Sequence, residues 1–136
     1  AGAPFIEPLR LAAALERLKL PGARFVPMFF KPEFSKHAGR VCGGVLVQVP
    51  DQERFRPFRA YFELIRLAAR LYPGKFKWQA PPYEFEFKRL PIDMICGSDR
   101  IRKAVEKDMP YTRIRDDIER GIRDYAEAAR PFLLYP

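Results

Sequence analysis

The loop spanning residues 29–44 brings together the residue types that could bind or react with a ligand. It holds Lys36, the only histidine, His37, then Arg40, and one of the two cysteines, Cys42. Two cations and a titratable imidazole on one loop can hold an anionic group through charge-assisted hydrogen bonds. We therefore expect Lys36, His37 and Arg40 to bind an anion. A solvated surface loop is the alternative interpretation.

Cys42 and His37 raise the question of nucleophilic catalysis. A catalytic cysteine needs a base within hydrogen-bond reach and a third group that orients the base, and the sequence specifies neither. Cys42 also leads into an apolar run, and free cysteine is among the residue types most often buried. One histidine and two distant cysteines cannot form a structural zinc site, and the glycines of the loop match no phosphate-binding pattern. No cofactor is expected.

A second candidate lies between residues 83 and 87, where aromatic and acidic residues alternate. This period of two predicts a half-buried strand with Glu84 and Glu86 on its exposed face, their Cα atoms about 6.5 Å apart. Glycoside hydrolysis uses two carboxyl groups about 5–9.5 Å apart. The pair would stand side by side rather than flank a bond, so one glutamate binding a ligand is favoured over the pair acting together. A solvated sheet face is the alternative. Trp78 could stack on a sugar or cover the core.

The remaining pattern predicts the elements that must position these residues. Apolar residues recur at helical spacing over residues 8–19, 58–72 and 112–130, and a short helix is expected after Gly97-Ser98-Asp99. Strands are expected at residues 24–30, 45–49 and 83–87. The apolar tail, residues 132–135, is expected to dock on the core. Together these elements predict a single α+β domain over residues 1–136, with a small mixed or antiparallel sheet and about four helices.

Charge and composition exclude some functions and leave others open. The net charge is +8, but the basic residues are interleaved with acids along the whole chain. This pattern is typical of solvated helix faces, so it does not favour nucleic-acid binding. No apolar run approaches the ~20 residues that span a bilayer, so no membrane partner is expected. Two cysteines imply no disulfide framework, and the pairing of Cys42 with Cys96 stays open.

An ordered set of short blocks resembles one protein family. The blocks are Gly2-Ala3-Pro4-Phe5-Ile6, Leu20-Pro21-Gly22-Ala23-Arg24-Phe25, Phe34-Ser35-Lys36-His37-Ala38-Gly39 with Cys42-Gly43-Gly44, Pro82-Tyr83-Glu84-Phe85-Glu86, Gly97-Ser98-Asp99 and Leu133-Leu134-Tyr135-Pro136. Together they resemble the C-terminal domain of the bacterial exo-β-N-acetylmuramidases, glycoside hydrolases of peptidoglycan turnover. The resemblance covers essentially the whole chain.

The resemblance implies a two-domain enzyme that releases N-acetylmuramic acid from the non-reducing ends of peptidoglycan fragments. An upstream Rossmann-like catalytic domain of the same polypeptide would be the partner, with the active site in the cleft between the domains. Lys36, His37 and Arg40 would then suit the lactyl carboxylate of the sugar. Tyr83 and Glu86 would contact substrate, and Glu84 is the best candidate for a catalytic residue. This domain alone is expected to be inactive.

Two expectations stay open at this stage. The competing function is a stand-alone basic module that binds nucleic acid or another polyanion. The location implied by the resemblance is secreted or periplasmic, because the family works on cell-wall fragments; any export signal would lie upstream, and a cytoplasmic location also stays open.

Overall fold

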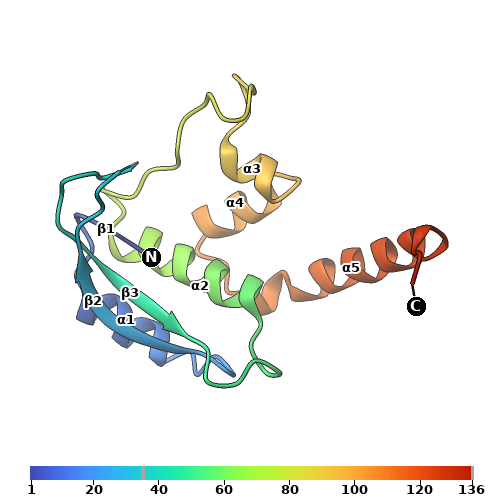
Figure 1. The fold of residues 1–136 in the computed structure, drawn as a ribbon, viewed down its shortest axis with the longest axis horizontal. Coiled ribbons are helices and arrows are strands. Elements are labelled where there is room, and N and C mark those ends of the chain that lie inside the picture. Colours follow the sequence, from blue (N-terminus) through green and yellow to red (C-terminus); the bar gives the residue numbers. More distant parts are fainter. Residues whose placement is uncertain (35, 136) are drawn as a thin grey trace.

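The computed structural model describes residues 1–34 and 36–135, and its sheet holds three antiparallel strands in the order β1-β3-β2 (Figure 1). The strands are β1 (Gly2–Ala3), β2 (Arg24–Phe30) and β3 (Cys42–Gln48). β2 and β3 form a hairpin in which Arg24 faces Gln48 and Phe30 faces Cys42. The two strands expected at residues 24–30 and 45–49 are thus confirmed, and β3 begins three residues earlier than expected. The fold is the α+β domain that the sequence predicts.

Two adjacent glycines let other parts of the chain approach the central strand closely. A Cβ atom on Gly43 would collide with the carbonyl oxygen of Ile6, and one on Gly44 would collide with the carbonyl oxygen of Ala1. Glycine lacks this atom, so the backbone can pack against both positions. These two residues therefore allow β1 and the start of α1 to lie against β3.

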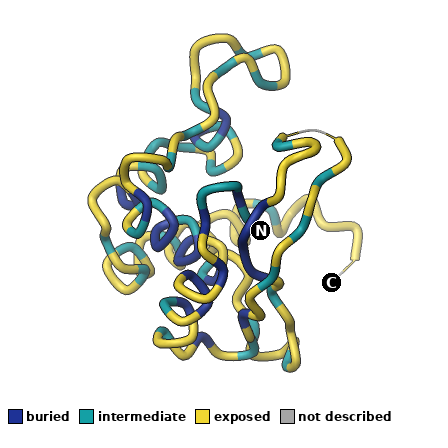
Figure 2. The backbone as a smooth tube through the Cα atoms, turned by 90° about the vertical axis from the view of Figure 1, so that its left-hand side faces the viewer, coloured by how far each residue is buried: buried dark blue, intermediate teal, exposed yellow. Residues whose placement is uncertain are grey.

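Helices α1 (Pro8–Glu16) and α2 (Pro57–Leu71) cover one face of the sheet, and both begin with a proline whose missing N–H costs nothing there (Figure 1). Leu11 and Leu15 of α1 are fully buried, as the apolar stripe predicts. They pack with Phe25, Val45 and Leu67 in the main hydrophobic core. Figure 2 shows the buried residues gathered between these elements.

The opposite side of α2 packs against the second half of the chain, which holds α3 (Pro91–Ile95), α4 (Arg100–Glu106) and the 3-10 helix η1 (Tyr111–Arg113). Phe62, Ala104 and Val105 form the centre of this second core. The short helix expected after residue 99 is confirmed as α4. The short helix α3 lies in a stretch for which the sequence pattern predicts no helix.

A buried ion pair also joins these two halves. Arg66 donates to Glu63 at 2.7 Å, and the two side chains are 6% and 5% exposed. Arg66 also pairs with Asp108, and Glu63 accepts the backbone N–H of Tyr111 at 2.9 Å. Arg66 lies off the apolar stripe that runs along this helix, so its burial does not follow from the periodicity of the sequence. Each charge is tolerated in the interior because it is paired and hydrogen-bonded.

The last helix, α5 (Arg115–Ala129), extends away from the rest of the fold and is followed by the 3-10 helix η2 (Arg130–Phe132) (Figure 1). None of its residues is buried. The expectation that the apolar tail docks on the core was wrong, since Leu134 is 90% and Tyr135 82% exposed. The helix leads the tail away from both cores.

The strand expected at residues 83–87 is wrong, because the chain makes a tight turn there. Tyr83 and Glu86 exchange two backbone hydrogen bonds at 2.9 Å. Glu84 and Phe85 between them adopt left-handed backbone angles, with φ of 46° and 64°. The Glu86 carboxylate accepts the N–H groups of the residues two and three positions on. Such local bonds give the backbone an alternative to a sheet ladder.

Both cysteines are free, and Cys42 is buried. Over residues 1–34 and 36–135, the structure has no helix long and apolar enough to cross a bilayer.

Candidate functional site

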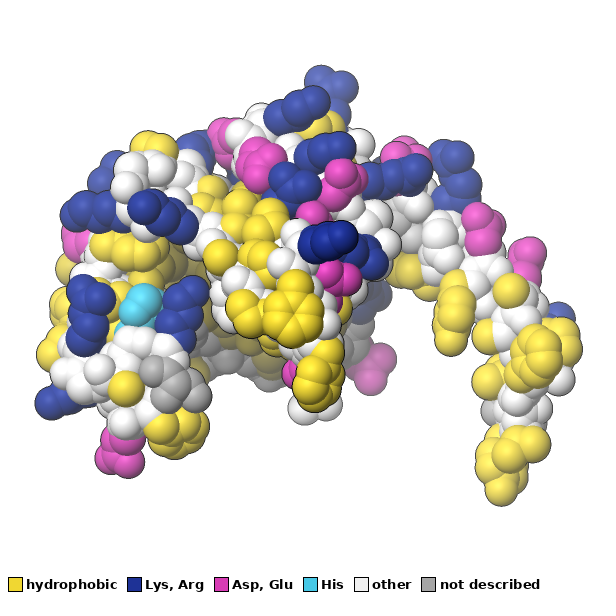
Figure 3. All heavy atoms as spheres, turned by 90° about the horizontal axis from the view of Figure 1, so that it is seen from above, with side chains coloured by type: hydrophobic (Ala, Val, Ile, Leu, Met, Phe, Trp, Pro, Cys, Tyr) yellow, Lys and Arg dark blue, Asp and Glu magenta, His cyan; other side chains and the backbone are white. Residues whose placement is uncertain are grey.

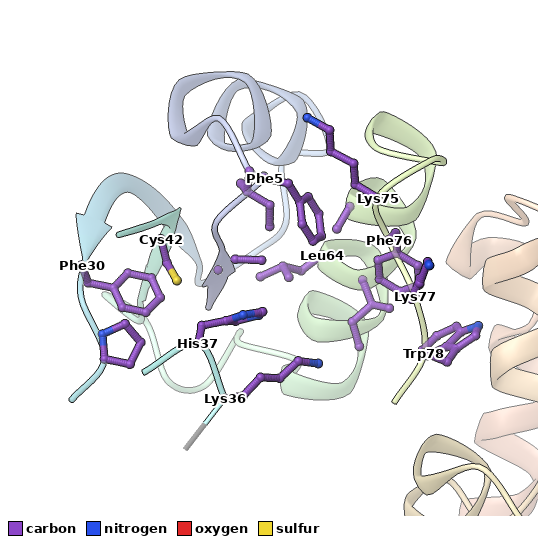
Figure 4. A pocket seen from close by; sticks show the side chains of 16 residues that line it. Phe5, Phe30, Lys36, His37, Cys42, Leu64, Lys75, Phe76, Lys77 and Trp78 are labelled. Atoms are coloured by element: carbon purple, nitrogen blue, oxygen red, sulfur yellow. The ribbon is translucent and has the colours of Figure 1, made fainter. Parts of the chain in front are cut away.

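A hollow of about 480 Å³ lies between the β2–β3 loop, the N-terminal segment, α2 and the segment that follows α2 (Figure 4). Its floor is apolar and comes from the segment between β1 and α1, the end of β2, the middle of α2 and the segment that follows α2. The apolar side chains that line the floor are Phe5, Ile6, Phe30, Leu64, Ile65 and Phe76.

The rim of this pocket is basic. Lys36 and His37 reach into it from the loop, while Lys75 and Lys77 belong to the opposite wall (Figure 4). No aspartate or glutamate is among the described residues that line it. Figure 3 shows the histidine of the loop lying between basic side chains. A pocket with this lining favours an anionic ligand that also presents an apolar surface.

Backbone hydrogen bonds hold the loop in the shape that presents His37. The N–H of Gly39 donates to the carbonyl of Pro32 at 2.8 Å, and the N–H of Arg40 donates to the carbonyl of His37 at 3.0 Å. His37 itself adopts a φ of 67°, in the left-handed region that non-glycine residues seldom occupy. These bonds form a turn, and they fix the backbone position from which the imidazole projects.

The charge on His37 responds to its surroundings. Desolvation by the protein lowers the pKa of His37 below its ordinary value of 6.5, and the positive charges of Lys36 and Arg40 lower it further. The neutral imidazole therefore predominates at pH 7. An anion bound beside it would favour the protonated form and would reverse this shift.

The opposite wall is held by its own set of contacts. The N–H groups of Lys75 and Phe76 both donate to the carbonyl of Tyr72, at 3.0 and 2.8 Å. Phe76 and Trp78 meet edge to face with their ring centroids 5.0 Å apart, and the Trp78 indole N–H donates to Glu106 at 3.0 Å. Trp78 thus lines the pocket and also packs against the second core. The interpretation that Trp78 covers the core is confirmed for the second core, and stacking on a sugar stays a prediction.

Sequence reasoning missed this wall. Lys75, Phe76 and Lys77 fall in a stretch without clear periodicity, which the sequence presents only as an irregular connection. The alternation of lysine and aromatic residues from 75 to 78 is the signal that could have indicated a basic, ring-lined surface. Nothing in the sequence indicates that this stretch lies across from the loop.

The structure separates the predicted site residues into two places. Lys36 and His37 lie in the pocket, and Arg40 lies in an adjoining hollow that shares Phe5, His37 and Lys75 with it. A second region lies on the turn near α3, away from the loop (Figure 1). It contains Tyr83 and Glu84, which line a shallow hollow, and Glu86, which closes the turn. The assembled pocket is therefore a combination of the predicted loop and a wall that was not predicted.

The carboxylates of the turn have different environments. Two backbone hydrogen bonds, from Lys88 and Arg89, lower the pKa of Glu86. Its carboxylate therefore serves the turn itself. Glu84 is exposed at the tip of the turn beside Phe85, whose side chain is 93% exposed. Without the expected strand, the two glutamates do not share one face of a sheet.

Cys42 lies at the edge of the pocket, where its thiol donates to the carbonyl of Arg40 at 3.7 Å. Within the described chain, the hydrogen bonds of this thiol include none with His37. The geometry does not supply the thiol–imidazole pair that nucleophilic catalysis needs. Residues 1–34 and 36–135 also contain no cluster of three or more residues that could hold a metal ion.

Comparison with known proteins identifies a family whose model matches nearly the whole chain. The family model described as exo-beta-N-acetylmuramidase NamZ, C-terminal, matches residues 1–135. The chain is 29% identical over 134 residues to the peptidoglycan beta-N-acetylmuramidase NamZ of Bacillus subtilis (strain 168), covering 98% of this chain and 30% of that protein. It is also similar to the crystal structure of a DUF1343 family protein from Bacteroides fragilis NCTC 9343, with a TM-score of 0.76 and 25% identity over 99% of this chain and 34% of that one. The chain thus spans about a third of the length of each relative.

Proposed function

The chain belongs to the family of C-terminal domains of the exo-β-N-acetylmuramidase NamZ, and from this we propose that it is the substrate-contacting part of a longer peptidoglycan hydrolase. The hydrolase would release N-acetylmuramic acid from the non-reducing ends of peptidoglycan fragments. An upstream catalytic domain of the same polypeptide would complete its active site. This chain would form one wall of the cleft between the two domains.

The observation that carries the proposal is the lining of the 480 Å³ pocket, which is basic at the rim, apolar at the floor and free of acids among its described residues. N-acetylmuramic acid differs from other cell-wall sugars by a lactyl carboxylate. Lys36, His37 and Lys75 offer donors to that carboxylate. The apolar face of the sugar ring and the acetamido methyl group suit the aromatic rings of Phe5 and Phe76.

The same lining limits the part that this pocket can play in the reaction. Glycoside hydrolysis requires a carboxylic acid and a second carboxylate beside the scissile bond, and the described lining supplies neither. The pocket would therefore bind and orient the sugar, while the acids come from the upstream domain or from Glu84. Glu84 is exposed, so it is free to meet a substrate held between the two domains.

We further propose that the protein works outside the cytoplasm, because its proposed substrate is a cell-wall fragment. Fractionation of cells that produce the full-length protein tests this location. The competing interpretation, a basic module for nucleic acid, receives no support from the family or from the relatives.

Hydrolysis of a chromogenic N-acetylmuramide by the full-length protein tests the proposal. Lys36→Ala and Lys75→Ala each remove one donor to the carboxylate and should raise KM about tenfold, which is about 1.4 kcal/mol, with little change in kcat. The matched control is Lys107→Ala, which removes an exposed lysine outside the pocket. Wild-type KM in both pocket variants would refute the assignment of the pocket.

Glu84→Gln tests the catalytic assignment separately. A glutamate that transfers a proton or attacks the sugar contributes a factor of about 10²–10⁴ to the rate, so kcat should fall by at least about a hundredfold while the protein stays folded. Retention of full kcat would show that Glu84 is not catalytic, and would leave the binding role of the pocket unaffected.

A further inference from the structure

Most of the apolar side of α5 is left uncovered by the described chain. Ile118, Ile122 and Tyr125 recur at helical spacing on this side, and Ile122 is 62% and Tyr125 75% exposed. Among the described helices and strands, α5 makes close backbone contacts only with η1 and η2, which flank it. Figure 3 shows hydrophobic side chains gathered along this projecting arm.

The same apolar surface continues beyond both ends of the stripe. At its root lies a hollow of about 320 Å³, which Ile114 and Ile118 share with Phe58 and Ile101. Beyond the helix, the exposed fractions of Phe132 and Leu134 reach 83% and 90%. We refer to Ile118, Ile122, Tyr125 and residues 132–135 as the α5 face.

The size of the α5 face marks it as an interaction surface. A large aromatic side chain buries about 150–250 Å² when it is covered, and the face carries three of them together with four large aliphatic residues. Its area is therefore on the order of 800 Å². The largest apolar patch on a typical monomer covers about 300–600 Å².

The helix itself also needs a partner. Isolated helices shorter than about 12–15 residues are marginal in water, and most helical stability in proteins comes from packing of an apolar face. With 15 residues and none of them buried, α5 lacks that contribution in the described chain. Covering the α5 face would supply it.

We propose that the α5 face docks on the upstream domain of the same polypeptide, an inference that rests on the proposed function. This chain accounts for 30% of the length of one relative and 34% of the other, and the matching family model is that of a C-terminal segment. The relatives therefore carry about two thirds of their length outside the region that matches. A domain of that size can cover a face of roughly 800 Å².

Hydrogen exchange on two proteins tests the docking. In the full-length protein, the backbone amides of residues 118–126 should exchange at least about tenfold more slowly than in the 136-residue chain. Ile122→Glu should abolish this protection. Arg123→Gln changes the net charge by the same one unit on the polar side of the helix, and should keep it. Sedimentation of the 136-residue chain should give a monomer.

Two outcomes overturn the docking. Equal exchange in the two proteins would show that α5 stays uncovered, and a dimer of the 136-residue chain that Ile122→Glu dissociates would make a second copy the occupant. Both results leave the hydrolase proposal intact if the full-length protein cleaves the N-acetylmuramide. Protection of α5 in a protein that neither binds nor cleaves the sugar would instead refute the proposed function alone.

Discussion

Removal of Arg66 should strongly destabilise the fold, because it would leave a buried carboxylate without its counter-charge. Glu63 and Arg66 are 5% and 6% exposed, and 2.7 Å separates the paired atoms. Breaking a buried pair by removing one partner costs about 3–5 kcal/mol. Since Asp108 is 44% exposed, water can solvate it in the variant, and its lost contact adds little.

We expect Arg66→Met to lower the free energy of unfolding by about 3 kcal/mol, at the lower end of that range. Methionine keeps an apolar stem in the space of the arginine, and Glu63 retains the N–H of Tyr111 at 2.9 Å. A domain of this size has a total stability of about 5–15 kcal/mol, so the loss is a large part of it. Urea denaturation followed by the fluorescence of Trp78 measures the change.

Two further variants separate charge from packing. Adding Glu63→Gln to Arg66→Met removes the uncompensated charge and should recover at least about half of the loss. Lys103→Met breaks an ion pair whose side chains are 57% and 43% exposed, and should change stability by less than about 0.5 kcal/mol. A loss below about 1 kcal/mol in Arg66→Met, or no recovery in the double variant, would refute the reasoning.

Three other predictions concern single positions. Gly43→Ala should cost about 1–3 kcal/mol of stability through overpacking, because its Cβ would collide with a backbone carbonyl. At Gly74 no atom lies within 4 Å of an added Cβ, so Gly74→Ala should change stability by less than about 0.5 kcal/mol. Thermal melts of both variants measure the difference. A hydrogen bond from Lys103 lowers the pKa of Asp99 in the folded protein below its ordinary value of 3.8. The stabilisation of the fold by this carboxylate is therefore present above pH 3.8 and is lost as the pH falls through the pKa of the folded state. An NMR titration midpoint of Asp99 at or above 3.8 would contradict this. Protonation of His37 adds a positive charge to the pocket, so affinity for an anionic sugar should rise as pH falls below 6.5, and His37→Gln should abolish that rise in a titration series.

The sequence predicts the elements of the first core well because their apolar residues follow one period. Leu11 and Leu15 mark one face of α1, and the β-branched run around Val45 marks a covered strand. Helix α2 is more difficult, since it is buried on two sides. Phe62 of this helix lies in the second core, while Leu64 and Leu67 lie in the first.

The errors came from interactions that a periodic pattern does not encode. The alternation at residues 83–87 has the period of a strand, but local hydrogen bonds to Glu86 favour a turn. Arg66 pairs with Asp108, which lies 42 positions away in the sequence, as well as with Glu63 of its own helix. The apolar tail was expected to pack within this chain, but the direction of α5 prevents that contact.

The sequence predicts one side of the candidate site, the loop, and does not predict the opposite wall. Lys36 and His37 stand out by their residue types within a short loop. Lys75 and Phe76 line the same pocket because they follow α2, which brings the chain back beside the β2–β3 loop. Spacing along the sequence cannot indicate this long-range arrangement. The turn that carries Glu84 lies away from the pocket. Glu84 would therefore contact only a substrate that extends from the pocket along the proposed cleft.

The most direct test of the central claim compares two sugars that differ by one group. N-acetylmuramic acid and N-acetylglucosamine share the ring and the acetamido group, and only the former carries the lactyl carboxylate. NMR titration of the 136-residue chain should show shifts of the amides of residues 36–39 and 75–78 with N-acetylmuramic acid, and affinity at least about tenfold lower for N-acetylglucosamine. Lys36→Ala and Lys75→Ala should each reduce this difference. Equal affinity for the two sugars, or shifts confined to other residues, would contradict the assignment of this pocket as the site that binds the carboxylate.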